Sequence, residues 1–424
     1  MIQRLSLKSA LICMVLFTSL WAQFTTPGRY YPESPKDSVL KFIDCMNANR
    51  TQQQKWYLDS LRKVQQDEFE ARSEENQDFL ADMESLKIPP SLDNFKTLFH
   101  LPPVAQYNSG MCWCYCGTSF FESEVNRLNG DKIKLSELYT VYWEYVEKAR
   151  RYIRRHGDSY FAEGSETEAL FDIWKKYGVV PASNYKGYLG DDSLHNHEAL
   201  FDELNDYLAY LKTYEIWNED QAIDYIKSIL NKHLGTPPTE FIYKGKKITP
   251  QIFFKTVLKL NFDDYIAVQS TSSLPFYSYG IFNVPDNWRR SEIYYNLPLD
   301  EFYSVIQRAI HQGYSLAIGG DVSEPGYRGE YDAAIIPSFD IPAERIDQDA
   351  RELRIDNGAT VDDHGIHVVG YTSYENQDWF LIKDSGRGSR KGKFKGYYMY
   401  HKDYIRLKML TYLIHKDCLK GSIK

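Results

Sequence analysis

The first regular pattern of apolar and polar positions lies between residues 38 and about 86. Apolar residues recur there three or four positions apart, as at Leu40, Ile43 and Met46, and Gln, Glu and Lys fill many of the other positions. This spacing places the apolar side chains on one face of a helix. The proline pair at positions 89 and 90 ends the pattern. We predict a pair of helices that packs on the main domain or, alternatively, forms a pro-segment that covers an active site.

Helical spacing returns after a second proline pair at positions 102 and 103. Apolar residues again fall three and four positions apart, and small or capping residues stand at the ends of the runs. The predicted helices comprise residues 112–128, residues 135–155 behind Ser136, and residues 164–181, which Gly164 and Ser165 open and Gly178 closes; residues 190–260 are mixed and mostly helical.

From about Tyr265 the pattern changes to short alternating or wholly apolar runs between turn residues, which is typical of strands. The predicted strands lie within residues 265–273, 313–322, 364–374, 378–384 and 395–404. Because helices come first and strands later, we predict an α+β fold with a cleft between a helical half and a β half.

The first 22 residues have the pattern of an export signal. Arg4 and Lys8 supply positive charge, and an apolar core of residues 10–20 is followed by small residues. This core is too short for a membrane span and no second one follows, so we expect no stable membrane insertion. We predict a signal peptide at 1–22, an N-terminal helical extension at 23–94 and a domain at 95–424 with a mostly helical insertion around 190–260. The mature protein is expected outside the cytoplasm, periplasmic or secreted.

Composition narrows the classes of partner. The apolar content is 43%, the charged content 25% and the formal net charge −8 over 424 residues. These values are ordinary for a globular protein, and the negative charge argues against nucleic acid as the main partner.

The cysteines point to one reactive thiol. Six are present, and Cys13 lies in the predicted signal, which leaves an odd number. Disulfides among Cys112, Cys114 and Cys116 would close small strained loops. Cys112 opens a predicted helix, where unpaired N–H groups and the helix dipole stabilise a thiolate. Cys114 and Cys116 are predicted to be small buried side chains; a metal site of all three is the alternative, which the helical placement disfavours.

A nucleophilic thiol needs a base, a group that orients the base, and donors for the developing oxyanion. Gln106 lies six residues before Cys112, so its amide N–H can point beside the Cys112 backbone N–H. His364 begins one predicted strand and Asp384 follows the next, so a hairpin can place them side by side. His367 is the rival base, and in a strand its side chain would face the side opposite to His364.

These residues stand in motifs that resemble the papain-like cysteine peptidases. "QYNSGMCW", "DHGIHVVGY" and "LIKDSGRGS" are similar to the segments that carry that family's glutamine, cysteine, histidine and asparagine. "WEYVEKAR", "EALFDIWKKYGVVP", "YNLPLDEF" and "AIGGDV" are similar to the branch of bleomycin hydrolase and bacterial aminopeptidase C. The resemblance spans residues 95 to 416.

The resemblance implies a papain-like fold of two lobes, one helical and one of antiparallel strands, with the active site in the cleft. It implies that Cys112 is the nucleophile, His364 the general base and acid, Gln106 the oxyanion donor and Asp384 the orienting group. Gly164 and Ser165 match the position at which family backbone binds the substrate chain. No cofactor and no metal are implied, and we take His195 and His197 as a loop pair rather than as ligands.

The sequence departs from the family pattern at two positions. Asp384 stands where the family usually has asparagine, and a carboxylate would stabilise the imidazolium more strongly. Gly386 stands where the family has a tryptophan that shields the pair, so we expect a more hydrated pair unless Trp379 or a tyrosine covers it. In the aminopeptidase branch the C-terminal tail anchors the amino end of the substrate. Residues 416–424 form only a short tail, and a nearby Asp or Glu is the alternative anchor.

Two functions follow from these observations. The first is an exported cysteine peptidase, aminopeptidase-like, that cleaves peptides or proteins through an acyl-enzyme. The alternative is a catalytically inactive peptide-binding protein on the same fold. The sequence leaves open exopeptidase against endopeptidase action, residue preference, the native substrate, and whether the chain forms a homo-oligomer, as that branch does.

Overall fold

The computed structural model describes residues 37–75, 78–189 and 194–420. The chain divides into two compact units, residues 1–77 and residues 78–424. The predicted signal peptide at 1–22 lies outside the described residues. Within the described residues, no helix combines the length and the apolar character that a membrane span needs.

The described part of the first unit is one continuous helix, α2, from Ser38 to Glu75. The prediction of a helix pair is therefore wrong. No glycine or proline stands between these residues to interrupt the helix. The prediction also extended the helical region too far, to about residue 86, whereas residues 78–86 contain no helix.

Residues 78–94, which we expected in the N-terminal extension, belong to the second unit and pack against its other residues. The Ala81 N–H donates to the Pro325 carbonyl at 2.9 Å, and the Arg328 guanidinium donates to the Ala81 carbonyl. Ala81 and Met83 are buried in a small core with Trp379. We call residues 78–94 the strap. Because the strap, with the proline pair at 89 and 90, is packed in the second unit, this unit begins before the predicted domain start at residue 95.

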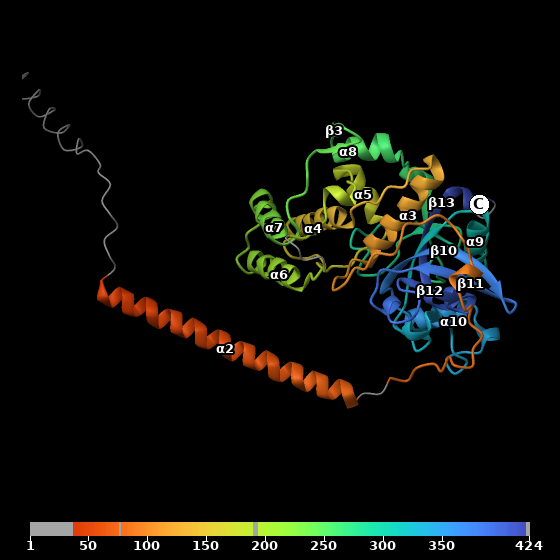
Figure 1. Cartoon of the computed structure of the whole chain (residues 1–424), viewed down its shortest axis with the longest axis horizontal. Coiled ribbons are helices and arrows are strands. Elements are labelled where there is room, and N and C mark those ends of the chain that lie inside the picture. The colour runs from red at the N-terminus through yellow and green to blue at the C-terminus, as the bar shows by residue number, and fades with distance from the viewer. Residues whose placement is uncertain (1–36, 76–77, 190–193, 421–424) are drawn as a thin grey trace, which may run out of the picture. The chain divides into compact units, whose positions relative to one another are not determined.

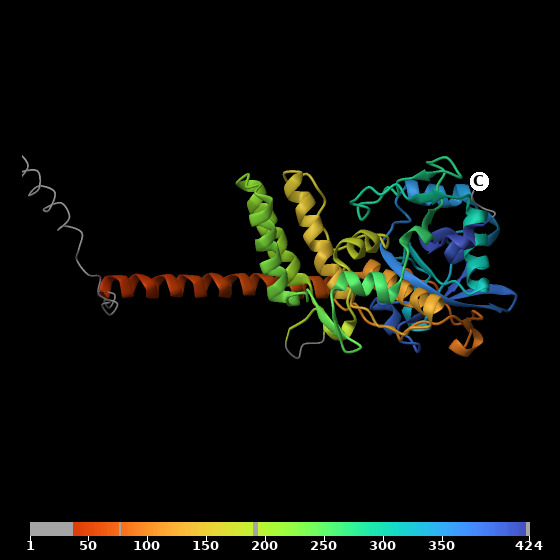
Figure 2. The same cartoon turned by 90° about the horizontal axis from the view of Figure 1, so that it is seen from above.

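The helical half of the second unit holds most of its helices (Figures 1 and 2). Figure 1 shows α4 to α8 gathered on one side and β10 to β13 on the other. The helices are α3 Cys112–Asn129, α4 Glu137–Arg154, α5 Ala169–Tyr177, α6 Glu198–Thr213, α7 Glu219–Leu234 and α8 Pro250–Phe253, and a hairpin of β2 Phe241–Tyr243 and β3 Lys246–Ile248 accompanies them.

The β half is built on an 11-stranded sheet in the order β5-β6-β4-β13-β7-β10-β11-β12-β9-β8, with β1 also paired to β10. Its strands are β1 Lys96–Thr97, β4 Tyr265–Gln269, β5 Tyr279–Gly280, β6 Tyr294–Asn296, β7 Leu316–Gly320, β8 Tyr327–Arg328, β9 Ala333–Ala334, β10 His364–Tyr374, β11 Gln377–Lys383, β12 Tyr397–His401 and β13 Met409–His415. Helices α9 Leu299–Gln312, α10 Gln348–Asp356 and α11 Lys402–Lys408 belong to this half. The α+β prediction is confirmed.

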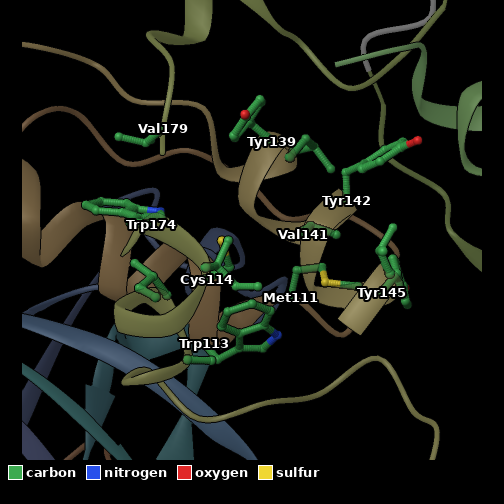
Figure 3. Close-up of a cluster of buried hydrophobic side chains, with 14 of the residues drawn as sticks. Met111, Trp113, Cys114, Tyr139, Val141, Tyr142, Tyr145, Trp174 and Val179 are labelled. Atoms are coloured by element: carbon green, nitrogen blue, oxygen red, sulfur yellow. The ribbon is translucent and has the colours of Figure 1, made fainter. Parts of the chain in front are cut away.

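Local sequence explains the helix starts next to the site. The Ser136 hydroxyl accepts a hydrogen bond from the Tyr139 N–H at 3.1 Å and so caps α4, as predicted. Figure 3 shows Trp113 and Cys114, at the start of α3, in one cluster of buried side chains with Tyr142 of α4 and Trp174 of α5. This packing gives the N-terminus of α3 a fixed position in the helical half.

The face of α3 that follows Cys112 joins the two halves. Cys116 and Ser119 lie one and two turns beyond Cys112. The Cys116 thiol donates to the Ile366 carbonyl at 2.9 Å, and the Ser119 Oγ lies 2.8 Å from His367 Nδ1. Gly365 brings β10 close, since a Cβ there would lie 3.4 Å from the Trp113 Cα. The packing of helix α3 on strand β10 therefore places Cys112, the first residue of the helix, near His364, the first residue of the strand.

Candidate active site

Cys112 is the first residue of α3 and is half-buried. The preceding residue, Met111, contributes no side-chain cap, while its carbonyl accepts the N–H groups of Cys114 and Tyr115 at 2.9 and 3.1 Å. The first N–H groups of a helix have no partner within it, point outward at its N-terminal end and favour a negative charge there. The start of α3 is thus suited to a thiolate at Cys112.

The other two cysteines of the cluster are buried, as predicted. The Cys114 thiol donates to the Glu137 carbonyl at 3.3 Å, and the Cys116 thiol donates to Ile366. Burial raises the pKa of both thiols well above the usual range, so both stay neutral. Nowhere in the described chain do three or more His, Cys, Asp or Glu side chains form a group that could hold a metal ion, and this includes the surroundings of His195 and His197.

His364 and Asp384 meet at the open end of a hairpin. Strands β10 and β11 pair from His367 opposite Lys383 up to a two-residue turn, in which Glu375 and Asn376 adopt positive φ. The next residues beyond the pairing therefore lie together, and His364 Nε2 is 2.7 Å from Asp384 Oδ1. A hydrogen bond also joins His364 to the Cys112 thiol. Because Nε2 is engaged by Asp384, the nitrogen that faces Cys112 is Nδ1.

The electrostatics of this pair favour a charged imidazole. Burial opposes the charge, but the Asp384 carboxylate and its hydrogen bond, followed by Cys112, raise the pKa of His364 well above its usual value. Burial would likewise raise the pKa of Asp384, but attraction to His364 and the donated hydrogen bonds lower it below its ordinary value. The arrangement is an imidazolium held between a carboxylate and a thiol.

The absence of a side chain at Gly386 does not leave the pair hydrated. The Asp384 side chain is 0% exposed and the His364 side chain 10% exposed. The Tyr327 hydroxyl donates to Asp384 Oδ2 at 3.1 Å, and the Gly386 N–H donates to Oδ1 at 2.7 Å. A tyrosine therefore covers the pair, as the sequence allowed, whereas Trp379 lies on β11 opposite His401 and packs in the small core.

Gln106 is held by Ser385 and Ser109. Its Oε1 accepts from the Ser385 hydroxyl at 2.7 Å, and its Nε2 donates to the Ser109 carbonyl at 2.7 Å. The Ser109 carbonyl can only accept, so the orientation of the amide is determined. A carboxamide nitrogen carries two N–H groups, and this bond uses one of them. Gln106 lines the same cavity as His364, where the second N–H can face an oxyanion.

Gly164 and Ser165 lie in an irregular segment before α5, which begins at Ala169 and not at the predicted Gly164. Lys148 Nζ donates to the carbonyls of Ala162, at 2.7 Å, and of Gly164. The Ser165 hydroxyl donates to the buried Glu144 at 2.7 Å, and Ser165 also lines the cavity next to Cys112.

Gly164 lies directly against the Asp286 side chain. A Cβ there would lie 2.0 Å from Asp286 Oδ2, so a substitution would displace the Asp286 carboxylate. The close approach explains the glycine at a position where the substrate chain is predicted to bind.

Two cavities meet at His364. The first has a volume of about 720 Å³ and is lined by Gln106, Gly110, Tyr327 and side chains of α6. The second is lined by Cys112, Ser165 and a set of acidic residues. The structure thus brings Cys112, His364, Asp384, Gln106, Gly164 and Ser165 together, and their catalytic roles stay a prediction.

Four residues at the site had no place in the sequence prediction. Ser385 stands directly after Asp384 in the quoted motif, so that motif contained a signal for it. Tyr327 lies in a two-residue strand, and Lys148 and Glu144 lie on the buried face of α4, so no local pattern marks any of them.

Comparisons with known proteins agree with this geometry. A family model described as the Peptidase C1-like family matches residues 50–424. Aminopeptidase C of Lactobacillus delbrueckii subsp. lactis is 24% identical over 374 residues, covering 75% of this chain and 80% of its own length. Bleomycin hydrolase of Rattus norvegicus is 22% identical over 269 residues, covering 53% and 58%. The crystal structure of PepW from Lactobacillus rhamnosis HN001 covers 86% of this chain and 94% of its own, with 19% identity and a TM-score of 0.64. The papain-like resemblance is confirmed.

Proposed function

Because the chain belongs to the Peptidase C1-like family and is a cysteine peptidase, we propose that it is an aminopeptidase that acts through Cys112. The observation that carries this proposal is His364 bonded on one side to Asp384 and on the other to Cys112 at the N-terminus of α3. Similarity to Aminopeptidase C over three quarters of the chain supports removal of N-terminal residues.

The proposed reaction is an acyl transfer in two steps. The Cys112 thiolate attacks the substrate carbonyl, and the oxyanion that forms accepts hydrogen bonds from the Gln106 amide and the Cys112 backbone N–H. The His364 imidazolium gives its proton to the leaving amine as the C–N bond breaks, which leaves a thioester on Cys112. The neutral imidazole then takes a proton from water, and the resulting hydroxide attacks the thioester. The C–S bond breaks, the carboxylic acid product leaves, and the Cys112 thiolate and His364 imidazolium are restored.

Export of the protein is part of the proposal. The positive charges at Arg4 and Lys8 and the apolar core behind them support secretion through a signal peptide. Peptides outside the cytoplasm would then be the substrates. A homo-oligomeric assembly stays a prediction.

Thiol labelling tests the proposed nucleophile. We expect iodoacetamide to modify Cys112 faster than Cys114, Cys116 and Cys418, which are buried, with each site followed by peptide mapping. His364→Ala should slow labelling of Cys112 by about 10-fold or more, since it removes the base that forms the thiolate, and should abolish peptide hydrolysis. His311→Ala is the matched control, because His311 is exposed at the end of α9 and lines neither cavity. Equal slow labelling of all the thiols in the unaltered protein would contradict the proposal.

A further inference from the structure

The cavity beside Cys112 is lined by a set of carboxylates, and His364 is the one basic side chain that the described residues contribute to its lining. Its lining includes Glu166, Glu168, Asp286, Asp362 and Asp363, and no lysine or arginine of the described chain lines it. We call these five residues the acidic set. They come from the segment before α5, the loop between β5 and β6, and the residues before β10. The fold thus brings negative charge from three distant segments to the side of the thiol.

Glu166 is the member of this set that most directly implies a ligand. Glu166 is only 8% exposed, and among the described residues no N–H or hydroxyl group donates to its Oε1; its carboxyl group shares a hydrogen bond with that of Asp362. Its Oε2 accepts from the Tyr294 hydroxyl at 3.3 Å. A buried carboxylate oxygen without a donor is costly, so this atom is suited to a donor that arrives with the substrate.

Lys148 and Arg289 attract Asp286 and Glu168 of the acidic set, but form their hydrogen bonds and ion pairs with other groups. Lys148 donates to the carbonyls of Ala162 and Gly164, and Arg289 forms a buried pair with Glu144. Neither residue lines the cavity. Like charges in one buried site disfavour ionisation. Burial and the neighbouring Asp362 raise the pKa of Glu166 well above its usual value, and burial and the neighbouring acids raise the pKa of Asp362 to about 7.

We propose that the acidic set binds an ammonium group of the substrate, with Glu166 and Asp362 as its principal partners; this inference rests on the proposed peptidase function. Because Cys112 itself lines the cavity, a cation bound there lies only a short stretch of chain from the thiol. The α-ammonium of an N-terminal residue meets that condition. A lysine side chain at the cavity carries the same chemistry, and the experiment below distinguishes the two sources.

The acidic set supplies what the sequence could not name, a local carboxylate that can anchor an amino group next to Cys112.

Hydrolysis of paired substrates tests the inference in the full chain. The substrates are leucine p-nitroanilide, its N-acetyl form, and N-acetyl-lysyl-leucine p-nitroanilide; the variants are Glu166→Gln and Asp362→Asn, with Asp206→Asn on the exposed face of α6 as the control for charge. For the free-amine substrate we expect kcat/KM to fall about 10- to 100-fold in either cavity variant and to stay unchanged in Asp206→Asn. The amide variants remove like-charge repulsion, so their Tm should not fall.

The substrate that responds identifies the source of the ammonium group. Loss confined to leucine p-nitroanilide assigns the cavity to the α-amino group, and loss confined to the acetylated lysyl substrate assigns it to a basic side chain. Equal kcat/KM in the unaltered protein and both cavity variants for every substrate that is hydrolysed would overturn the inference and leave the proposed function standing.

A second measurement does not depend on turnover. The cationic reagent trimethylammonioethyl methanethiosulfonate and the neutral methyl methanethiosulfonate both modify thiols, and peptide mapping follows Cys112 alone. We expect the ratio of cationic to neutral rates to fall several-fold in Glu166→Gln/Asp362→Asn and to stay unchanged in Asp206→Asn. An unchanged ratio would overturn the inference. Normal labelling without hydrolysis of any peptide would instead count against the proposed function.

Discussion

The imidazole of His364 depends on one carboxylate and one thiol. Asp384 Oδ1 lies 2.7 Å from His364 Nε2. The Asp384 carboxylate also accepts hydrogen bonds from the Tyr327 hydroxyl and from the Gly386 N–H. An asparagine could keep the geometry but not the charge. Because the pKa of His364 is raised chiefly by that charge, the carboxylate should determine the pH range over which the imidazolium persists.

Asp384→Asn should therefore keep measurable activity and shift its pH profile. Without the negative charge the imidazolium loses its proton at a lower pH, so the alkaline limb of kcat/KM should move down by about 1 pH unit or more. The profile is measured with a free-amine p-nitroanilide between pH 5 and 10. An unchanged alkaline limb would show that Asp384 does not act on His364.

Tyr327→Phe is the matched control for this shift. It keeps the Asp384 charge and removes only the donor to Oδ2. The alkaline limb should stay in place, while the buried oxygen left without its donor should lower the free energy of unfolding by about 1–3 kcal/mol. Urea unfolding of this variant, compared with its pH profile, separates the loss of a hydrogen bond from the loss of a charge.

At the scale of elements, the active site depends on the contact of α3 with β10. Gly365 lies against the start of α3, and a Cβ there would meet Trp113 and Cys116 at 3.4 and 3.5 Å, which is ordinary contact. The family motif resembled by "DHGIHVVGY" has alanine at this place. Larger side chains would push the helix and the strand apart.

Gly365→Val should thus damage both fold and activity, whereas Gly365→Ala should not. The branched methyl groups overpack a closed contact, and we expect a loss of about 1–3 kcal/mol in the free energy of unfolding. Activity should fall further than stability alone explains, because the displacement separates Cys112 from His364. Urea unfolding and Cys112 labelling of the two variants measure this; equal results for Ala and Val would contradict the role given to the contact.

The elements next to the site were the most predictable ones. The predicted helix at 112–128 and α3 agree within one residue at each end, and the predicted strands at 364–374 and 378–384 became β10 and β11. Strong patterns and clear end signals explain this: Ser136 caps α4, and Gly130 ends α3 with φ 77°. The long helix α2 was wrongly predicted as two helices. Apolar residues are sparse in its middle, which suggested a break, but no glycine or proline there interrupts the helix.

At the scale of the whole molecule, what the sequence could not predict is the meeting of distant segments. Glu166, Asp286 and Asp362 are separated by more than 75 residues at each step, and no local pattern relates them. Tyr327 reaches Asp384 in the same way, from a strand of two residues. The dyad was predictable because family motifs mark it; the acidic set and the tyrosine cover required the fold.

The strap of residues 78–94 contacts the segment that carries Tyr327. Ala81 bonds Pro325 through its N–H, and Arg328 through its carbonyl, so the strap flanks both ends of the segment that carries Tyr327. Met83 is 1% exposed in the small core. The strap should therefore stabilise β8 and, through Tyr327, the Asp384 carboxylate.

Two truncations test this connection. A chain that begins at Asp78 keeps the strap and the core of the second unit, so its Tm should match that of the full chain. A chain that begins at Phe95 loses the burial of Met83 and the bonds of Ala81, which should cost about 3 kcal/mol or more. Because β8 is then unsupported, kcat/KM should fall at temperatures where the shorter chain is still folded. Equal activity of the two truncated chains would show that the strap stabilises the fold without affecting the active site. If both truncated chains were more active than the full chain, this would support a pro-segment role for the residues before 78.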